Sequence, residues 1–152
     1  MREFQSVEEL KAAVGQELGT GPWTEIGQAT VDAFAEATGD HQWIHVDVER
    51  SRRESPFGTT VAHGFLTLAL FPQAMYDLWR LVPAKGSLNY GLNRVRFPAP
   101  VRTGSRVRIR AVLKSVDTQE GGRVLCTVDG TMEIEGGAKP ACSAEMLVMF
   151  LV

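Results

Sequence analysis

The chain has 152 residues, of which 44% are hydrophobic and 22% are charged, and its formal net charge is −2. These values are typical of one globular domain covering residues 1–152, and they exclude a disordered chain and a basic, non-specific nucleic-acid surface. The two cysteines, Cys126 and Cys142, have no metal-binding or redox spacing, so they predict buried thiols in a reducing compartment. We expect a cytoplasmic protein, because no secretory signal is visible and no apolar run is long enough to span a bilayer.

The first third of the chain predicts short elements separated by turn residues. In chain order these are a helix at residues 7–14, a strand at 23–26, a helix at 28–38 and a loop at 51–58. Ser6 is a favourable N-cap for the first helix. The second helix places apolar residues at intervals of three and four and ends at Gly39, which suits a left-handed C-cap. The expected loop is polar and contains Pro56 and Gly58.

A long apolar helix is predicted at residues 59–79, where the sequence reads TTVAHGFLTLALFPQAMYDLW. Thr59 and Thr60 are its candidate N-caps. Because the segment is apolar on every side, we expect it to be buried all round. Pro72 removes a backbone donor from the interior of the segment and predicts a kink there.

The second half of the chain changes to the two-residue period of strands with one buried face. Three alternating sets carry this signal: Leu88, Tyr90 and Leu92; Val107, Ile109 and Ala111; and Val124, Cys126, Val128, Gly130, Met132 and Ile134. The pairs Gly121-Gly122 and Gly136-Gly137 predict tight turns between the last three strands. The period slips at residues 93–94, which predicts a bulge. An antiparallel sheet of four or five long strands curled around the apolar helix satisfies both halves, so the predicted fold class is α+β.

The stretch TGDHQWIHVD, residues 38–47, holds ionisable groups among apolar neighbours. One interpretation is that Asp40 caps a turn and His45 is a partly buried polar residue, and spacing alone favours it. The alternative is a proton-transfer pair, because the stretch lies between a helix and a polar loop, where catalytic groups collect. Trp43 and Ile44 would lower the local dielectric and favour a neutral imidazole, which can take up a proton and return it.

Gly64 is a candidate for binding a ligand oxygen at the start of the apolar helix. Backbone N–H groups in a first turn have no intrahelical acceptor, and a residue without a side chain lets a carbonyl oxygen approach closely. The helix dipole would favour negative charge on that oxygen. The equally supported alternative is that Gly64 only permits close packing against the sheet. His63 is interpreted as structural, because its side chain should point away from the direction of the Gly64 amide.

A basic run and the three histidines are interpreted without a bound ion. The run consists of Arg102, Arg106, Arg108 and Arg110. The last three alternate on one strand face, which favours a solvated surface over a site for the phosphates of a ligand. The histidines lack third and fourth ligands at a recognised spacing, so no metal is expected.

Three stretches together carry a family resemblance: FAEATGDHQWIHVD, PFGTTVAHGFLTLAL and NYGLNRVRFPAPVRTGSRV. Over essentially its whole length the chain resembles the MaoC-like dehydratases, which are (R)-specific enoyl-CoA hydratases, and in particular the short single-domain hydratases of actinobacteria. The resemblance implies a single hotdog domain in which a curved antiparallel sheet wraps a long central helix. It also implies the reversible syn addition of water to trans-2-enoyl-CoA, which gives (3R)-3-hydroxyacyl-CoA without a cofactor.

The resemblance further implies roles for individual residues. Asp40 and His45 would hold and activate one water molecule, His45 would take its proton, and the pair would deliver a proton to C2. The Gly64 amide would form the oxyanion hole for the thioester oxygen. Three more residues are implied in substrate binding: Phe65, Asn89 and Asn93. Some members carry a serine about two turns after the helix glycine, where this chain reads Leu70, Phe71 and Pro72.

Members with one hotdog domain join as homodimers through their sheet edges, so a homodimer is expected here. Two alternatives stay open. A hotdog acyl-CoA thioesterase usually places a lone carboxylate on the central helix, and this chain offers only Asp77 near the far end. The chain would otherwise be the catalytic subunit of a heterodimeric acyl-thioester dehydratase, because it keeps both Asp40 and His45.

Overall fold

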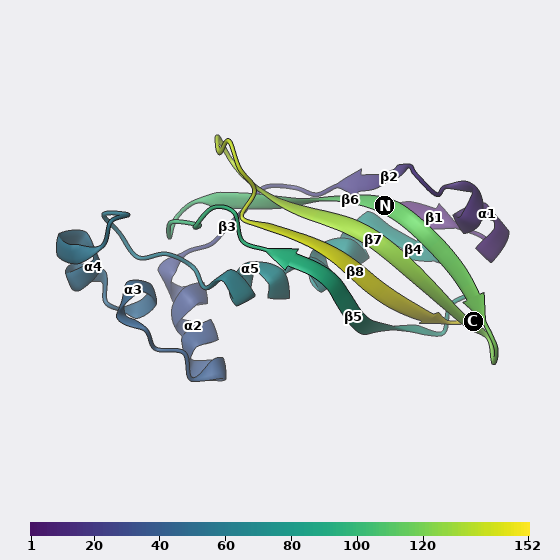
Figure 1. Ribbon diagram of the computed structural model, residues 1–152, viewed down its shortest axis with the longest axis horizontal. Helices are drawn as coiled ribbons and strands as arrows, with labels where there is room; N and C mark the ends of the chain where they lie inside the picture. Colours follow the sequence, from purple (N-terminus) through teal and green to yellow (C-terminus); the bar gives the residue numbers. More distant parts are fainter.

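A curved antiparallel sheet forms the body of the molecule in the computed structural model, which describes residues 1–152 (Figure 1). Its strands follow the order β2-β6-β7-β8-β5, and β3 also pairs with β6. They are β2 (Glu17–Thr20), β3 (Thr24–Glu25), β5 (Gly86–Arg96), β6 (Arg106–Gln119), β7 (Arg123–Ile134) and β8 (Cys142–Leu151). Four of these strands are long, as predicted. Strand β5 ends the sheet, so one of its two edges has no partner.

The apolar segment forms two consecutive helices against one face of the sheet, α5 (Gly64–Ala69) and α6 (Phe71–Leu78) (Figure 1). The predicted start at residue 59 is wrong, because Val61 forms a β-bridge with Arg102 and the backbone there is extended. The N-cap is His63, which makes no side-chain capping bond. At Pro72 the predicted kink is a helix break, since this residue occupies the first turn of α6, where its missing N–H has no cost. Neither helix has the length and apolar character needed to cross a membrane, and the same holds for the other helices.

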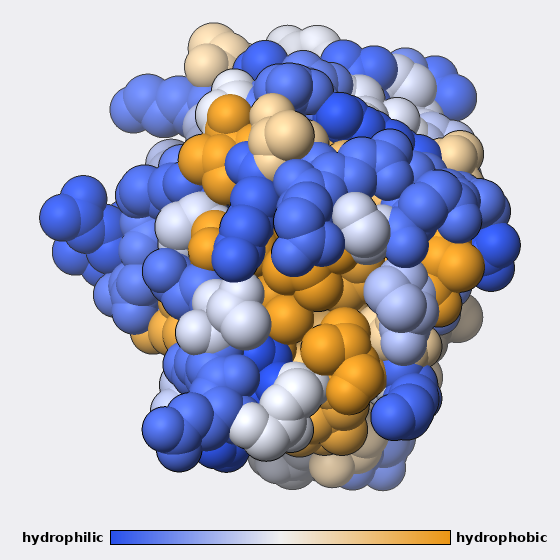
Figure 2. Space-filling view, turned by 90° about the vertical axis from the view of Figure 1, so that its right-hand side faces the viewer, coloured by the Kyte–Doolittle hydropathy of each residue, from blue (hydrophilic) through white to orange (hydrophobic).

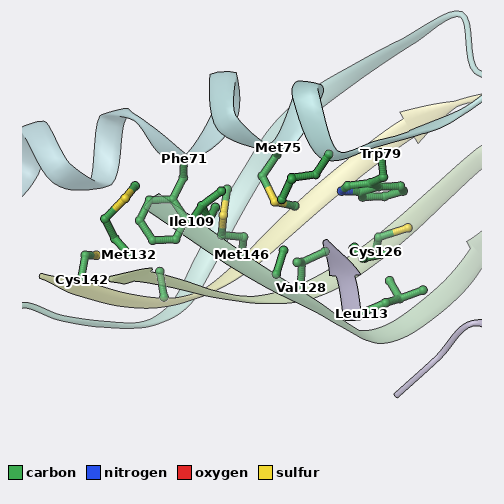
Figure 3. Close-up of a cluster of buried hydrophobic side chains, with 14 of the residues drawn as sticks. Phe71, Met75, Trp79, Ile109, Leu113, Cys126, Val128, Met132, Cys142 and Met146 are labelled. Atoms are coloured by element: carbon green, nitrogen blue, oxygen red, sulfur yellow. The ribbon is translucent and has the colours of Figure 1, made fainter. Parts of the chain in front are cut away.

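The core lies between these helices and the sheet. Figure 3 shows Phe71, Met75 and Trp79 pointing from the helix and its end towards the side chains of the strands. The predicted alternation of β6 and β7 is confirmed, because their inward residues are buried: Val107, Ile109, Ala111, Val124, Cys126, Val128, Gly130 and Met132. Burying each large apolar side chain contributes roughly 1.5–3 kcal/mol to folding.

Strand β5 departs from its predicted burial. The exposed fractions of Leu88, Tyr90 and Leu92 are 56%, 63% and 43%. The predicted bulge near residues 93–94 is confirmed as a register shift between Leu92 and Val95, and a second shift lies between Asn89 and Gly91. Alternation reports which residues share a face, but it cannot report whether another element covers that face. The central helix is likewise not buried all round, because Phe65 is 70% exposed.

The N-terminus packs at the end of the molecule that also holds the C-terminus (Figure 1). Helix α1 (Val7–Ala12) begins as predicted, with the Glu9 amide donating to Ser6 Oγ. Strands β1 (Arg2–Phe4) and β4 (Trp79–Leu81) form a separate parallel pair. The sequence did not predict them, because a parallel pair of three-residue strands leaves no periodic signal. Trp79 therefore belongs to a strand and not to the end of the central helix.

Three helices gather at the opposite end of the sheet (Figure 1). They are α2 (Gln28–Thr38), α3 (Trp43–Val46) and α4 (Val48–Glu54). Helix α2 has its predicted bounds and ends at Gly39, whose φ is 77°. The predicted loop at 51–58 is wrong in its first half, because Asp47 caps α4 by accepting a hydrogen bond from the Arg50 amide. Gly121 and Gly136 have left-handed φ values of 73° and 71°. The predicted tight turn at Gly121-Gly122 is confirmed, because only residues 120–122 join β6 to β7, whereas residues 135–141 join β7 to β8, so the connection at Gly136-Gly137 is a longer loop than predicted.

Candidate active site

Asp40 lies in the turn that joins α2 to α3, and its two carboxylate oxygens have different surroundings. Oδ1 accepts a hydrogen bond of 3.3 Å from the Gln42 amide, so Asp40 does cap a turn. Oδ2 lies 4.0 Å from Nε2 of His63. The side chain is 54% exposed. One oxygen thus holds the turn while the other stays available to a ligand.

His45 lies on α3 with its ring buried and its tautomer fixed. Nδ1 lies 2.6 Å from the carbonyl oxygen of Val61. A carbonyl oxygen only accepts hydrogen bonds, so Nδ1 carries the proton and Nε2 of the neutral ring keeps its lone pair. Burial lowers the pKa of His45, the Val61 hydrogen bond opposes this effect, and His63 adds to the lowering. The ring is therefore a neutral base near pH 7.

The side chain of Gln28 joins three segments around His45. Its Nε2 donates to the His45 carbonyl at 2.7 Å and to Asp32 Oδ1 at 2.8 Å. Its Oε1 accepts a hydrogen bond of 2.5 Å from the buried Thr60 hydroxyl, which also lies 2.7 Å from Thr103 Oγ1. Both N–H groups of this amide donate, and its oxygen accepts one hydrogen bond. The sequence did not identify Gln28, because its contacts join residues far apart in the chain.

His63 is the residue whose environment differs most from the sequence interpretation. Its ring stacks on that of His45, with centroids 3.7 Å apart and planes inclined by 24°. Its Nε2 lies 2.9 Å from the main-chain oxygen of Asp40, and Phe34 packs on it with centroids 5.0 Å apart. From the sequence, His63 was interpreted as structural, and that interpretation did not include these contacts with the candidate pair. The letters HG at the start of the apolar helix give no signal of this contact, which depends on the fold.

Asp40, His45 and His63 each place one side-chain nitrogen or oxygen within 4.8 Å of the corresponding atoms of the other two. No hydrogen bond joins the Asp40 carboxylate directly to the His45 ring. A separation of up to 4.8 Å leaves room for one water molecule hydrogen-bonded to both side chains. The cluster is poorly arranged for a metal ion, because nearly parallel stacked rings do not direct their in-plane lone pairs to one point.

Gly64 follows His63 directly and is the first residue of α5. Its amide has no acceptor within the helix. A Cβ atom at this position would lie 3.1–3.2 Å from three ring atoms of Phe97. The lack of a side chain therefore lets Phe97 pack against the backbone at the helix start, which agrees with the close-packing interpretation; the binding of a ligand oxygen by the Gly64 amide stays a prediction. Phe97 also contacts Phe65, with ring centroids 5.8 Å apart.

Three cavities follow one another along the exposed side of α5 and α6. The first, of about 450 Å³, is lined by Phe34, Thr38, Asp40, Phe65, Leu68 and Ala69. The second, of about 250 Å³, shares Leu68 and lies between Pro72 and strand β5. The third, of about 310 Å³, shares Pro72 and ends at Trp79 and Phe150. The shared helix residues, Leu68 and Pro72, are four positions apart, so they lie on one face. This face with its cavities is called the helix groove below.

The far end of the groove lies away from helices α2–α4. Figure 2 shows that end of the molecule, where a strip of apolar side chains is exposed between hydrophilic ones. Asn89 lines both the second and the third cavity, and Phe65 lines the first. Asn93 is not brought to the groove, because its Nδ2 donates to Glu145 Oε1, which belongs to a polar group with Lys114.

The basic run on β6 is neutralised by carboxylates. Three pairs form across the sheet: Arg106–Glu135, Arg108–Glu133 and Arg110–Glu17. Arg108 also lies over the ring of Trp23 at 4.3 Å. The predicted exposed strand face is confirmed for these three arginines. Cys126 and Cys142 are buried free thiols, as predicted, and burial raises the pKa of Cys142 to about 11.

This chain belongs to the MaoC-like family, since the family described as MaoC like domain matches residues 9–135. It is 52% identical over 151 residues to 3-hydroxyacyl-thioester dehydratase Z of Mycobacterium tuberculosis, and 99% of each chain is covered. It is 44% identical over 145 residues to Nodulation protein N of Rhizobium leguminosarum bv. viciae, which covers 95% of this chain and 90% of that protein. The predicted family is therefore confirmed.

A solved structure gives the same result for the fold. The (R)-hydratase from A. caviae involved in PHA biosynthesis matches with a TM-score of 0.72 at 25% identity, covering 89% of this chain and 94% of that chain. The predicted fold, a hotdog domain of the α+β class, is confirmed. The names of these relatives are those of dehydratases and hydratases, so the predicted enzyme class, a hydro-lyase, is confirmed as well.

Proposed function

We propose that the protein is an (R)-specific enoyl-CoA hydratase, which reversibly adds water to trans-2-enoyl-CoA and gives (3R)-3-hydroxyacyl-CoA. The observation that carries the proposal is the state of His45: its Nδ1 is held by Val61, which leaves Nε2 basic, and the His45 side chain lies within 4.8 Å of the Asp40 carboxylate. Membership of the MaoC-like family supports a dehydratase of 3-hydroxyacyl thioesters. The choice of CoA as the carrier and of the R product follows the resemblance stated above.

The proposed reaction uses one water molecule held between Asp40 and His45. As the water oxygen forms a bond to C3, Nε2 of His45 takes one of its protons. The π electrons of the double bond move towards the thioester carbonyl and give an enolate. The Asp40–His45 pair then returns a proton to C2 on the same face, so the net change is the addition of H and OH. A positioned acid–base pair of this kind contributes about 10²–10⁴-fold to the rate.

The Gly64 amide would stabilise the enolate oxygen. It is free within helix α5 and lies one residue from His63, which contacts both members of the pair. Removal of one oxyanion donor costs on the order of 10²–10³-fold in rate. In this arrangement the Gly64 amide would contact the thioester oxygen, and His45 would act on the water molecule at C3, at the other end of the conjugated system.

The helix groove would hold the acyl chain. It begins at Asp40, where the reacting carbons must lie, and its walls are largely apolar. Phe65 would contact the acyl chain near the reacting carbons, and Asn89 would contact it further along. The role of Asn93 in substrate binding stays a prediction, although its amide is already bonded to Glu145.

We propose a homodimer that forms through strand β5. This strand has an unpaired edge, and it exposes Leu88, Tyr90 and Leu92 on the surface. Pairing two β5 edges would satisfy backbone groups that a monomer leaves to solvent. A heterodimer would use the same edge with another chain, so the mass of the protein purified alone, measured with its activity, separates the two assemblies.

The test is the hydration of crotonyl-CoA, followed by the loss of absorbance of the conjugated thioester. Asp40→Asn and His45→Gln should each abolish turnover while the fold stays intact by circular dichroism. Asp77→Asn is the matched control, because Asp77 is exposed near the end of α6 and is the carboxylate that a thioesterase would need. Near wild-type hydration in either site variant would exclude that residue from the reaction.

The stereochemistry needs a separate measurement. The hydrated product is offered to a hydroxyacyl-CoA dehydrogenase of R or of S specificity. The R-specific coupling enzyme should reduce its cofactor at the rate of hydration. A strong signal with the S-specific enzyme would contradict the proposal.

A further inference from the structure

We propose that His63 is a positioning residue, which holds the Asp40 turn and the His45 ring in one arrangement at the start of the central helix. The inference rests on the proposed function, because it assigns a role in the same reaction. It concerns a residue that is 2% exposed and that has no surface from which to bind substrate directly.

The first contact fixes the position of Asp40. The main-chain carbonyl oxygen of Asp40 can only accept a hydrogen bond. In the 2.9 Å contact, Nε2 of His63 is therefore the donor. The bond reaches the main chain of Asp40 and not its carboxylate. It therefore anchors the turn while leaving Oδ2 available, and it does so from a residue 23 positions away in the sequence.

The second contact fixes the ring of His45. Two rings with centroids 3.7 Å apart and nearly parallel planes leave no room for the His45 ring to tilt towards His63. Phe34 of helix α2 packs on His63 as well. The hydrogen bond from His45 Nδ1 to Val61 restricts rotation of the His45 ring in its own plane, and the stacked His63 ring restricts its tilt out of that plane.

The hydrogen-bonding state of His63 indicates that this arrangement has a cost. When Nε2 carries the proton, Nδ1 of the neutral ring is an acceptor, and this atom is buried without a partner. A buried acceptor without a hydrogen-bond partner lowers the stability of the folded protein. An apolar residue would avoid that cost. The imidazole is explained by its two contacts, the hydrogen bond from Nε2 to the Asp40 carbonyl oxygen and the stacking of its ring on His45.

The decisive comparison is between His63→Gln and His63→Asn. Both side chains are smaller than histidine, so both fit the site, and both remove the ring stack. Gln can place its amide nitrogen near the position of Nε2, whereas Asn places it near the position of Nδ1. Only Gln can therefore restore the donor to the Asp40 carbonyl. Thermal unfolding and circular dichroism confirm that the two variants are folded to the same extent.

With crotonyl-CoA, we expect kcat of His63→Asn to fall by about 10²-fold, the size of loss that a misplacement of about 1 Å produces. His63→Gln should recover most of that loss, and KM should change little in either variant. Two folded variants with equal kcat would overturn the role of the hydrogen bond. A wild-type protein without hydratase activity would instead refute the proposed function, which keeps the two failures distinct.

The pH profile tests the stack separately. The titratable groups that act on His45 are His63, which lowers its pKa, and Asp40, which raises it. Loss of the His63 ring should therefore move the acid limb of kcat/KM to higher pH in both variants. An unmoved limb in folded protein would show that the His63 ring does not act on His45 and would overturn this part of the inference.

Discussion

Nδ1 of His45 donates a hydrogen bond of 2.6 Å to the carbonyl oxygen of Val61, which lies three residues before the central helix. This bond joins the cluster of helices at one end of the sheet to the backbone from which the helix starts. It sets the tautomer of the proposed base and the direction of its free lone pair. The reactivity of the site therefore depends on the placement of a main-chain atom.

The first prediction concerns the pH dependence of activity. Burial lowers the pKa of His45 from its ordinary value of 6.5. Because the base acts in its neutral form, kcat/KM should stay at its plateau down to a pH below 6.5 and fall only as pH passes through the lowered pKa. A pH–rate profile with crotonyl-CoA measures this. An acid limb above 6.5 would contradict the assignment of His45 as a neutral base.

The same shift predicts a change in stability with pH. Below about pH 6.5 the unfolded chain binds a proton at His45 that the folded protein does not yet accept. The free energy of unfolding should therefore decrease as pH falls from this value towards the folded pKa, and His45 should contribute no slope above it. Urea unfolding across this range measures the slope, and His45→Gln, which cannot titrate, should show a flatter dependence than the wild type.

The third prediction tests the hydrogen bonds around Gln28. Thr60→Val keeps the shape of the buried side chain but removes the hydroxyl that donates to Gln28 Oε1. An unpaired amide oxygen in this partly buried place should cost about 1 kcal/mol of stability, and kcat should fall because the His45 backbone is held less firmly. Thr60→Ser keeps the hydroxyl and is the matched control. If Val and Ser gave the same kcat, the Gln28 bonds would not position His45.

The fourth prediction concerns packing between the central helix and the sheet. A Cβ atom at Gly130 would lie 2.4 Å from the buried ring of Phe71. Gly130→Ala should therefore lower the free energy of unfolding by at least the roughly 1–3 kcal/mol typical of an overpacked core. Gly86→Ala is the control, since a Cβ there meets nothing within 4 Å. Equal unfolding midpoints for the two variants would show that Phe71 can move aside.

The fifth prediction tests the groove as the site of the acyl chain. Ser87 lines the cavity at the far end and is half-buried. Ser87→Phe should fill that cavity, raise KM for a long-chain enoyl-CoA several-fold and leave crotonyl-CoA hydration unchanged. Ser143→Phe, on exposed β8 surface, is the control. A KM for the long substrate that stays at the wild-type value would place the acyl chain elsewhere.

Elements with local signals were predicted well. Helix α2 has its predicted bounds because Gly39 supplies a left-handed C-cap at the end of a periodic apolar face. The start of the central helix was misplaced by five residues, because Thr60 and Val61 look like helix residues but are bound by Gln28 and Arg102. These are tertiary contacts, which override the local helix propensity of Thr60 and Val61 and cannot be read from it.

The candidate pair was predicted from the sequence, but its surroundings were not. Asp40 and His45 stand out because ionisable groups occur among apolar neighbours within one short stretch. His63 and Gln28 became visible only when the fold placed a ring 3.7 Å from His45 and an amide 2.7 Å from its carbonyl oxygen. Contacts between segments 17 or more residues apart depend on chain packing, which a single sequence does not reveal.

Residues 60–63 are tied to their surroundings at every position. The Thr60 carbonyl oxygen accepts a hydrogen bond from the Thr103 amide. The Val61 amide donates to the Ile44 carbonyl oxygen, and the Ala62 amide donates to the Val101 carbonyl oxygen. Any displacement of residues 60–63 would break their hydrogen bonds to residue 44 and to residues 101–103 together. Loosening residues 101–103 would therefore disturb the His45 ring, the Asp40 turn and the start of α5 in one event. Hydrogen exchange of these amides should accordingly report a single shared opening free energy, which makes the site cooperative in the sense used for folding units.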